Sequence, residues 1–542
     1  MRESGSETLW QLGIMPSGHG QVGSILFKQV TPLFVLPPFR TIHSRSRIRY
    51  GDCMRYSKRA RKQVERHLSQ ARDYEQWREA AAALDDMDGL LTWREQGETD
   101  MLHESLIRQH MQTMQRCRRE GDTRRLIRVL QESLYRHLGE LSNTELYAVA
   151  RTGTKRLVSD FLSEVETSMG FICDHPVAEM SAERKLHLFQ AAERVYGRPA
   201  LMLSGGAAFG IFHLGVTRAL WRQDLLPDVM AGSSMGAIVA AAICTRDEAG
   251  LRQFFEHPEQ IHTQAFRWLE PAEMLRAGHA MDPRQLQDHV RANIGTPSFR
   301  EAYELSGRTL NISVSPTRTQ QKPRLLNQLA SPEVTVDSAV MASCAVPGIY
   351  PPVTLEAREV HGGPDSRVPY MPTESWIDGS VHGDLPLMRM ARLHNVNKTI
   401  VSQANPHVVP FISHHHQRGI GAFTRRAAIA LAHGQVSTAL KLTRQGPQPG
   451  ILRPLLEQAH AMASQDYLGD INIPFPFRPA LYRKVLSNPD AEDLAMFIRL
   501  GEEATWPRMA MIHDQTRISR AFVRCIKRLK REVGAECNTS PA

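Results

Sequence analysis

The stretch PDVMAGSSMGAIVAAAIC, residues 227–244, allows few local structures. A short apolar run leads into GSSMG, which consists of Gly232, Ser233, Ser234, a methionine and Gly236, and an alanine-rich run that favours a helix follows. The spacing Gly-x-Ser-x-Gly is typical of a sharp strand-to-helix turn that presents its serine at the helix N-terminus. The pattern predicts a strand–turn–helix unit in which Ser234 is a nucleophile, with a purely structural turn as the alternative.

A second glycine-rich turn, LSGGAAFG at residues 203–210, lies upstream and also follows a short apolar run. Backbone N–H groups at such a turn suit an anion, such as the oxyanion of ester hydrolysis. The dinucleotide pattern Gly-x-Gly-x-x-Gly fails at Ala207, and no Gly-Lys-Ser/Thr follows for a phosphate-binding loop. An oxyanion hole is therefore the favoured interpretation of this turn.

Strands and helices alternate from residue 198 onward, where apolar runs such as PALML, TLNISV and KTIVSQ are separated by helical patterns. This alternation is typical of an α/β fold with a mainly parallel sheet covered by helices on both faces. We expect this core over residues 198–404. The two glycine-rich turns would then face one place at the carboxyl edge of the sheet, where α/β folds bind ligands.

Three further regions flank the expected core. Residues 54–197 carry apolar positions at helical spacing and predict an α-helical domain. Residues 405–542 are expected to be mostly helical and to complete or flank the core. Residues 1–53, rich in Gly, Ser, Pro and Arg without a period, predict a disordered leader. The sequence leaves open whether translation starts at Met1 or at Met54.

Composition limits the environment and the partners. Lys and Arg exceed Asp and Glu by 66 to 57, and the resulting net charge of +9 suits an anionic surface such as phospholipid headgroups. No motif for nucleic-acid binding accompanies the charge, and no apolar run is long enough for a transmembrane helix. The seven cysteines are scattered without a C-x-x-C pair, which favours a reducing, intracellular compartment.

Two basic helical segments are candidates for contact with a membrane surface. The first is the cluster of Lys and Arg at residues 55–66, for which a solvated helix face is the favoured interpretation. The second is RISRAFVRCIKRLKRE at residues 517–532. Its apolar positions share one stripe: Ile518, Phe522, Cys525 and Leu529. We expect this helix to dock on the protein, and an interfacial membrane helix is the alternative.

A serine nucleophile needs a base to accept its proton. Histidine with an acid behind it is the usual partner. The candidates are His361, His382, His394 and His407. None lies in a context that distinguishes it from a surface or packing residue. Asp378 in SWIDGS ends a short apolar run and precedes Gly379, and it is the better candidate, provided that it is buried beside Ser234.

Together these features resemble the patatin-like phospholipase family, in which a Gly-Gly-x-x-x-Gly turn, Gly-x-Ser-x-Gly and Asp-Gly follow one another. Residues 72–94 resemble the helical domain that precedes the patatin core in fungal-type triacylglycerol lipases and in bacterial relatives. Further similar stretches are RPAL at 198–201, PRLLN at 323–327, ASCAVPG at 342–348 and VSQANPH at 401–407. The resemblance extends over residues 70–480.

The resemblance implies a three-layer α/β core with a Ser–Asp dyad and no catalytic histidine, metal or cofactor. Ser234 would be the nucleophile and Asp378 the general base. The oxyanion hole would be formed by the backbone N–H groups of Gly205, Gly206 and Ala207. The supporting glycines of these motifs are Gly210, Gly232, Gly236 and Gly379.

Three positions depart from the family pattern. Ala207 stands where a third glycine is frequent, so the loop must adopt a conformation open to alanine. Phe209 stands where many members carry Lys or Arg, which removes a charge and favours neutral acyl esters. Ser380 follows Asp-Gly where Ala or Gly is usual.

By the resemblance, the chain hydrolyses fatty-acyl esters of acylglycerols or phospholipids as a peripheral protein at a membrane or lipid-droplet surface. Two alternatives remain at this point. One is an α/β-hydrolase with a histidine triad, and the other is a catalytically silent scaffold that binds lipid or a partner. The sequence does not indicate the preferred acyl chain, the headgroup or the oligomeric state.

Overall fold

The computed structural model describes most of the chain. The described residues are 57–96, 99–134, 141, 143–176, 180–318, 322–359, 363, 366–380, 385–412 and 468–539. The predicted leader at 1–53 lies outside these residues, as do two of the candidate bases, His361 and His382.

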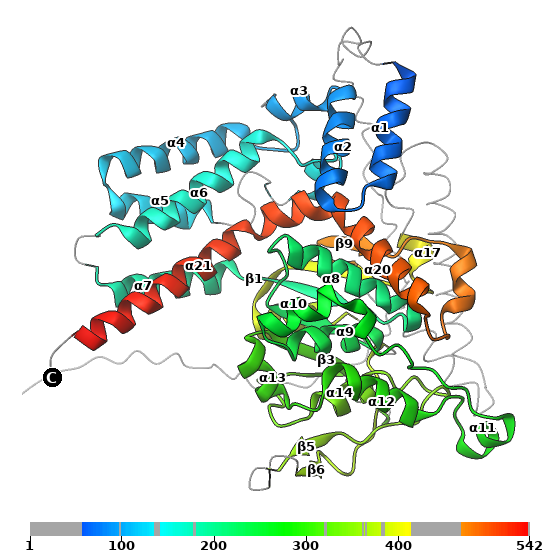
Figure 1. Ribbon diagram of the computed structural model, residues 1–542. Helices are drawn as coiled ribbons and strands as arrows, with labels where there is room; N and C mark the ends of the chain where they lie inside the picture. Colours follow the sequence, from blue (N-terminus) through cyan, green and yellow to red (C-terminus); the bar gives the residue numbers. More distant parts are fainter. Residues whose placement is uncertain are drawn as a thin grey trace, which may run out of the picture. The chain divides into compact units, whose positions relative to one another are not determined.

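A seven-stranded, mainly parallel sheet forms the centre of the fold (Figure 1), as predicted. The strands are β1 (Arg198–Leu203), β2 (Val229–Gly232), β3 (Thr309–Pro316), β4 (Arg324–Leu326), β7 (Trp376–Asp378), β8 (Val396–Gln403) and β9 (Ile471–Pro474). Their order is β4-β3-β2-β1-β8-β9, and β7 also pairs with β3. Only β4 and β7 run antiparallel to the strand they pair with. A separate hairpin joins β5 (Glu356–Arg358) and β6 (Arg367–Pro369).

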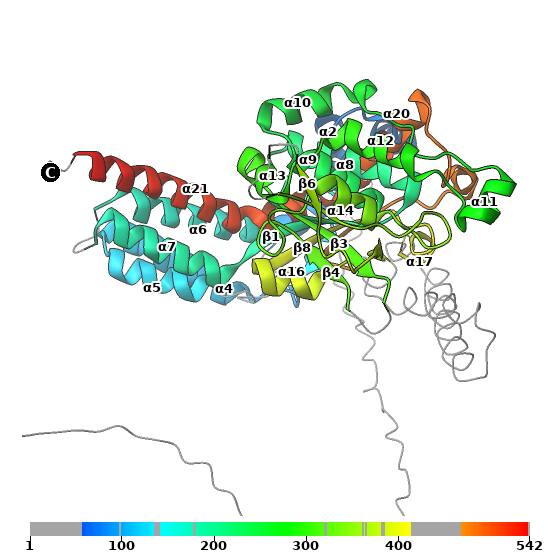
Figure 2. The same cartoon turned by 90° about the horizontal axis from the view of Figure 1, so that it is seen from below.

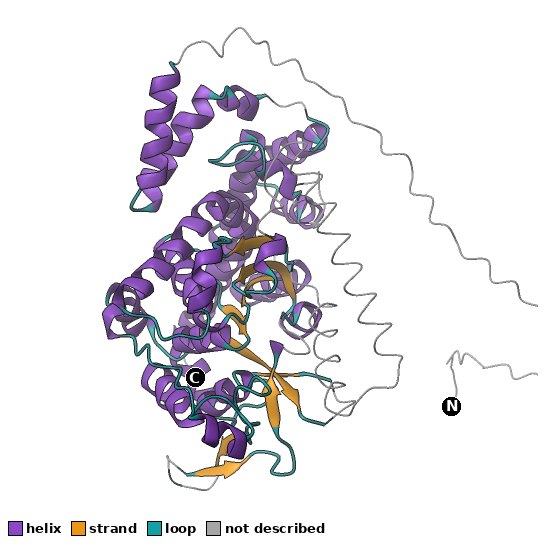
Figure 3. Cartoon of the chain, turned by 90° about the vertical axis from the view of Figure 1, so that its right-hand side faces the viewer, coloured by secondary structure: helices purple, strands orange, loops and turns teal. Residues whose placement is uncertain are grey.

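Helices cover both faces of the sheet (Figure 3). The helices of this region are α8 (Phe212–Arg222), α9 (Met235–Cys244), α10 (Glu248–Glu256), α11 (Pro271–Ala277), α12 (Pro283–Ile294), α13 (Phe299–Ser306), α14 (Val336–Ser343), α16 (Leu387–His394), α17 (Val409–Ile412) and α20 (Ala491–Thr505). Because side chains alternate along a strand, Leu201 and Leu203 join the core under α8 and α9. Ala200 and Met202 instead pack with Met390 of α16. The result is a three-layer α/β core.

The N-terminal described region consists of helices, also as predicted. They are α1 (Lys58–Gln70), α2 (Tyr74–Met87), α3 (Leu90–Glu95), α4 (Glu104–Glu120), α5 (Thr123–Ser133), α6 (Arg156–Asp174) and α7 (Ala182–Tyr196). Local sequence sets their ends: Gly121 stops α4 with a left-handed φ of 70°, and the Asp122 side chain caps α5.

The long C-terminal helix α21 (Met509–Thr539) packs against α6 and α7 (Figure 2). Its predicted apolar stripe is buried, since Phe522 is 1% exposed and Leu529 is fully buried. The prediction of a docked helix is therefore confirmed for this segment. The region after residue 404 also supplies β9 to the sheet and α20 to the layer beside α8.

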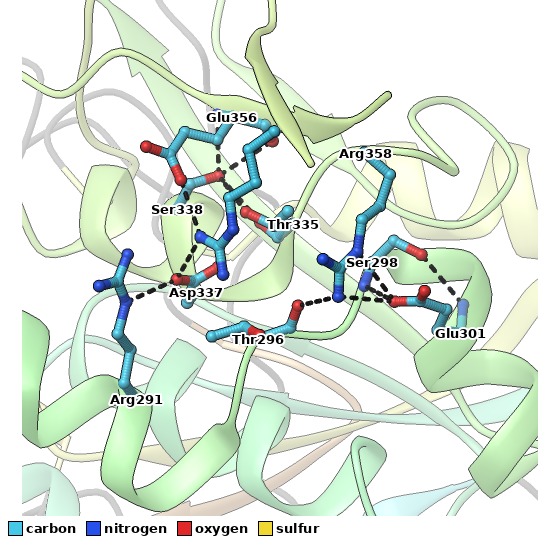
Figure 4. A network of polar contacts seen from close by, with 10 residues as sticks. Arg291, Thr296, Ser298, Glu301, Thr335, Asp337, Ser338, Glu356 and Arg358 are labelled. Atoms are coloured by element: carbon cyan, nitrogen blue, oxygen red, sulfur yellow. Dashed lines mark hydrogen bonds and ion pairs between the residues drawn. The ribbon is translucent and has the colours of Figure 1, made fainter. Parts of the chain in front are cut away.

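An ion-pair network anchors the first turn of α14, the helix that leads to Ser343 (Figure 4). Asp337 is buried, and its Oδ2 atom lies 3.1 Å from Arg291 Nε of α12 and 3.1 Å from Arg367 Nη1 of β6. The network therefore links α14 with α12 and β6.

We expect Asp337→Asn to lower the free energy of unfolding by about 2 kcal/mol, because two cations lose a buried partner but remain partly exposed. Urea unfolding measures this loss. The control is Glu333→Gln, which removes a more exposed pair with Arg300 and should cost less than about 1 kcal/mol. Equal losses in the two variants would contradict a special role for the network.

Candidate active site

Ser234 lies on a strained turn between β2 and α9. Its φ of 51° and ψ of −126° are rarely adopted by residues with a side chain, and such strain is typical of functional turns. Ser234 is partly exposed, whereas Ser233 is fully buried. The Ser234 N–H donates a hydrogen bond of 3.0 Å to Ser343 Oγ, which donates one of 2.8 Å to Ser313 O. The turn thus presents Ser234, and α14 holds it.

The glycines of this turn are required by close approach. A Cβ atom on Gly232 would lie 2.4 Å from Gly236 O, and one on Gly236 would lie 2.3 Å from Leu203 O. Gly210 leaves room for Met235, since a Cβ there would lie 2.4 Å from Met235 Cγ. The motif therefore lets α9 start directly against the end of β1.

Asp378 reaches the same place through the register of the sheet. Ile312 of β3 pairs with Gly232 on one side and Leu326 on the other. Two residues further along β3, Val314 pairs with Arg324 of β4 and with Asp378 of β7. β7 therefore pairs with the same edge of β3 as β2 does, beyond the residue at which β2 ends. The ends of β2 and β7 therefore point at one another, two residues of β3 apart, or about 7 Å.

Neighbouring residues connect Ser234 with the Asp378 loop. A Cβ on Gly205 would lie 3.5 Å from Ser234 Cβ and 3.6 Å from Ser380 Cβ. Ser380 N donates a hydrogen bond of 2.7 Å to Asp378 Oδ1, and Asp378 is completely buried. Gly379 is needed here because a Cβ would lie 2.2 Å from Ser313 O.

The Cys344 thiol interacts with both predicted dyad residues. Burial raises the pKa of Cys344 well above its usual range, the Asp378 carboxylate raises it further, and a hydrogen bond with Ser234 opposes these effects. The pKa of this one thiol thus depends on both side chains. The structure brings together Ser234, Asp378 and Gly205, whose catalytic roles stay predictions.

The glycine-rich loop passes over this site. In the described part of the chain, the N–H groups of Gly206 and Ala207 have no hydrogen-bond acceptor, whereas Ala208 N donates to Val485 O at 3.0 Å. A Cβ on Gly206 would lie 2.9 Å from Ala404 O. Ala207 has a φ of 47°, so it adopts the left-handed region at a cost of about 1 kcal/mol. The loop therefore accommodates Ala207 only in a strained backbone conformation.

Phe209 points into an aromatic cluster. Its ring stacks on Phe475 at 4.5 Å between centroids, and it is fully buried. A small cavity of about 40 Å³ is lined by Met235, the residue after Ser234, and by other residues that include Ile238 of α9 and Phe254 of α10.

Of the two candidate histidines that the structure describes, one has another hydrogen-bond partner and the other is exposed. His394 Nε2 lies 2.7 Å from Asn311 Oδ1, and His407 is exposed. A histidine not considered from the sequence, His213, is fully buried behind the glycine-rich loop. Its Nε2 lies 3.0 Å from Ser204 O and its Nδ1 lies 2.7 Å from Ser402 Oγ. These contacts tie the loop to β8.

Burial lowers the pKa of His213 from 6.5 to about 4. Between these values the unfolded chain binds a proton that the folded protein excludes, so stability falls as pH falls through this window. We expect a loss of about 2 kcal/mol from pH 7 to pH 5 from this residue. Urea unfolding at both pH values should show this part of the loss in the wild type and not in His213→Gln.

The control for this pH dependence is His187→Gln, since His187 is exposed on α7. It should leave the difference between pH 7 and pH 5 unchanged. A His213→Gln variant with the same difference as the wild type would show that His213 is not a buried neutral group.

Among the described residues, no group of three or more His, Cys, Asp and Glu side chains is arranged to hold a metal ion. The part of the chain covered by the structure also contains no helix long and apolar enough to cross a membrane.

A strained serine turn, a facing buried aspartate and a glycine-rich loop lie at one edge of a mainly parallel sheet, an arrangement typical of α/β ester hydrolases. Comparison with known families agrees. Residues 201–391 match the family described as patatin-like phospholipase, and residues 54–194 match a domain of unknown function, DUF3336.

The relatives carry both regions. The chain is 33% identical over 529 residues to the triacylglycerol lipase SDP1L of Arabidopsis thaliana, with 94% of the chain and 63% of that protein covered. It is 32% identical over 486 residues to the triacylglycerol lipase ptl3 of Schizosaccharomyces pombe, with 87% and 99% covered. It spans 50% of the length of triacylglycerol lipase 4 of Saccharomyces cerevisiae, at 31% identity. The chain belongs to the patatin-like phospholipase family, in the group whose members also carry the N-terminal helical domain.

Three residues of the site were not assigned from the sequence: Ser343, Cys344 and His213. The first two lie in ASCAVPG, which the resemblance singled out without giving it a role. Their neighbourhood depends on α14 reaching the end of β3, and no local pattern encodes that contact.

Proposed function

We propose that the chain hydrolyses fatty-acyl esters, with Ser234 as the nucleophile and Asp378 as the general base. The observation that carries this proposal is the meeting of β2 and β7 end to end beside β3. It places the strained Ser234 turn opposite a buried carboxylate.

In the proposed reaction, Asp378 accepts the Ser234 proton as Oγ attacks the ester carbonyl. The N–H groups of the loop at Gly205, Gly206 and Ala207 stabilise the oxyanion, and the alcohol leaves with the proton. Water then attacks the acyl-enzyme, again with Asp378 as base, and the fatty acid is released.

The proposed substrates are acylglycerols, with phospholipids as the second class. The glycine-rich loop at residues 203–210 supports a neutral acyl ester, because it carries no cation and its Phe209 is buried. The similar proteins from Arabidopsis thaliana and Schizosaccharomyces pombe, which are triacylglycerol lipases, support the same substrate class.

A lipid panel tests the substrate class. Wild type and Ser234→Ala are compared on a triacylglycerol emulsion, phosphatidylcholine vesicles and lysophosphatidylcholine, and released fatty acid is measured. We expect release from triacylglycerol to be the fastest, and to be absent with the variant. Release from phospholipid alone would reject the acylglycerol proposal while keeping the nucleophile.

We further propose a peripheral position at the lipid surface. The support is α1, which has no buried residue and exposes Lys58, Arg59 and Lys62. Replacing these three residues by Gln should lower sedimentation with anionic vesicles and leave hydrolysis of a soluble ester unchanged. Unchanged sedimentation would reject the role of α1.

Ser343 is proposed as a positioning residue, because its hydroxyl accepts the N–H of the strained Ser234. Ser343→Ala should lower kcat about tenfold with little change in KM, since one hydrogen bond of about 1–2 kcal/mol holds the turn. Ser343→Thr should restore most of the rate. A change confined to thermal stability would argue against positioning.

A further inference from the structure

A second cavity, of about 370 Å³, lies at the other end of the sheet. Its lining residues come from the amino-terminal ends of β1 and β2, from the segment before β2, and from α7 and α21. Figures 1 and 2 show where these helices and strands lie in the fold. β1 runs from Arg198 at this cavity to Leu203 before the glycine-rich loop, a distance of roughly 17 Å for a strand of this length. The cavity is therefore separate from the site at Ser234.

The cavity has an apolar wall. Leu225 and Leu226 contribute from the segment before β2, and Val523 and Ile526 contribute from α21. Val523 is 46% exposed, although it is a large aliphatic residue on a docked helix. An apolar surface left open in a concave site is typical of ligand binding, and 370 Å³ lies at the lower end of the range for ligand pockets. A ligand with one chain suits this size better than one with several.

Three cations from one side of α21 also line the cavity: Arg520, Lys527 and Lys530. Within the described residues none of them forms an ion pair, and Arg520 Nε is buried without a hydrogen-bond partner. Burial, and then Arg524, lower the pKa of Arg520, and Asp224 and Glu166 oppose this only in part.

Two other cations of α21 do have acidic partners. Arg524 pairs with Glu166, and Arg528 pairs with Asp174. The three cations that line the cavity therefore differ from Arg524 and Arg528, which have acidic partners.

The carboxylates of the cavity do not balance these cations. Glu193 is already paired with Arg198 at 2.9 Å, and Asp228 is the remaining acid. Three cations against one carboxylate leave an excess of positive charge beside an apolar wall. A ligand with an anionic head and an apolar chain satisfies both.

We propose that this cavity binds a long-chain carboxylate, such as a free fatty acid. The carboxylate lies among Arg520, Lys527 and Lys530, and the chain lies against the apolar wall. The inference does not depend on the proposed hydrolysis, because a free fatty acid has no ester bond and binds whether or not Ser234 is a nucleophile.

Fluorescence titration of the full chain with cis-parinaric acid tests the proposal. Lys527→Gln with Lys530→Gln removes two cations, and Val523→Trp fills the cavity from an exposed position. Each change should weaken binding at this site by about tenfold or more. The matched controls are Lys322→Gln with Arg531→Gln, and Val195→Trp, all exposed residues that do not line the cavity. The controls should bind as the wild type does.

Competition identifies the head group. Oleate should displace the probe, whereas methyl oleate, which lacks the charge, should not. Equal binding by the cavity variants and their controls would overturn the proposal, as would displacement by methyl oleate as strong as by oleate. Stronger displacement by lysophosphatidate than by oleate would assign the cavity to phosphate-bearing lipids and overturn a carboxylate site.

Discussion

Ser234→Ala should abolish labelling by a fluorophosphonate ester and lower kcat for acyl-ester hydrolysis by at least about 10⁴-fold. Without the hydroxyl no acyl-enzyme forms, and the remaining rate comes only from binding and from the loop N–H groups. Labelling is followed by gel fluorescence, and hydrolysis by release of fatty acid. This prediction has one of the two largest expected effects, because it removes the attacking atom itself.

The neighbouring serine provides the control. Ser233→Ala changes a fully buried residue on the same turn, so it tests the turn without the nucleophile. We expect it to keep labelling and to retain activity within about tenfold. Labelling that survives in Ser234→Ala, or that is lost only in Ser233→Ala, would contradict the assignment. If the wild type neither labels nor hydrolyses any ester, the alternative of a silent lipid-binding scaffold gains support.

Local patterns were sufficient for the parts of the fold that are made locally. GSSMG joins the last residue of β2 to the first turn of α9, as its flanking runs predicted. Only glycine fits where α9 approaches the end of β1. The stripe on α21 predicted a docked helix because four apolar residues share one face.

The parts that depend on distant registers were not predictable in this way. The facing ends of β2 and β7 follow from the antiparallel pairing of Asp378 with Val314, which lies 64 residues away in the sequence. The contact of Ser343 with Ser234 spans 109 residues. The conformation of Ala207 could not be predicted from local sequence either. Its positive φ opposes the preference of alanine and is imposed by the surrounding loop. The domain boundaries at residues 197 and 404 stay predictions.

The choice of base matters most for the mechanism, and Asp378→Asn decides it. Asn has nearly the same shape and can still accept the Ser380 N–H, but it cannot take a proton. We expect kcat to fall by about 10³-fold or more, near the upper range for loss of a general base. The variant should unfold at a temperature close to that of the wild type, which separates loss of the base from loss of the fold.

The histidine alternatives are tested in the same assay. The variants are His361→Gln, His382→Gln, His394→Gln and His407→Gln. Each should keep activity within about threefold, as expected for residues away from the reacting atoms. A histidine variant that loses activity, together with an Asp378→Asn variant that keeps it, would establish a histidine triad instead. Activity lost in Asp378→Asn and kept in all four histidine variants leaves the buried carboxylate beside Ser234 as the group that takes the proton.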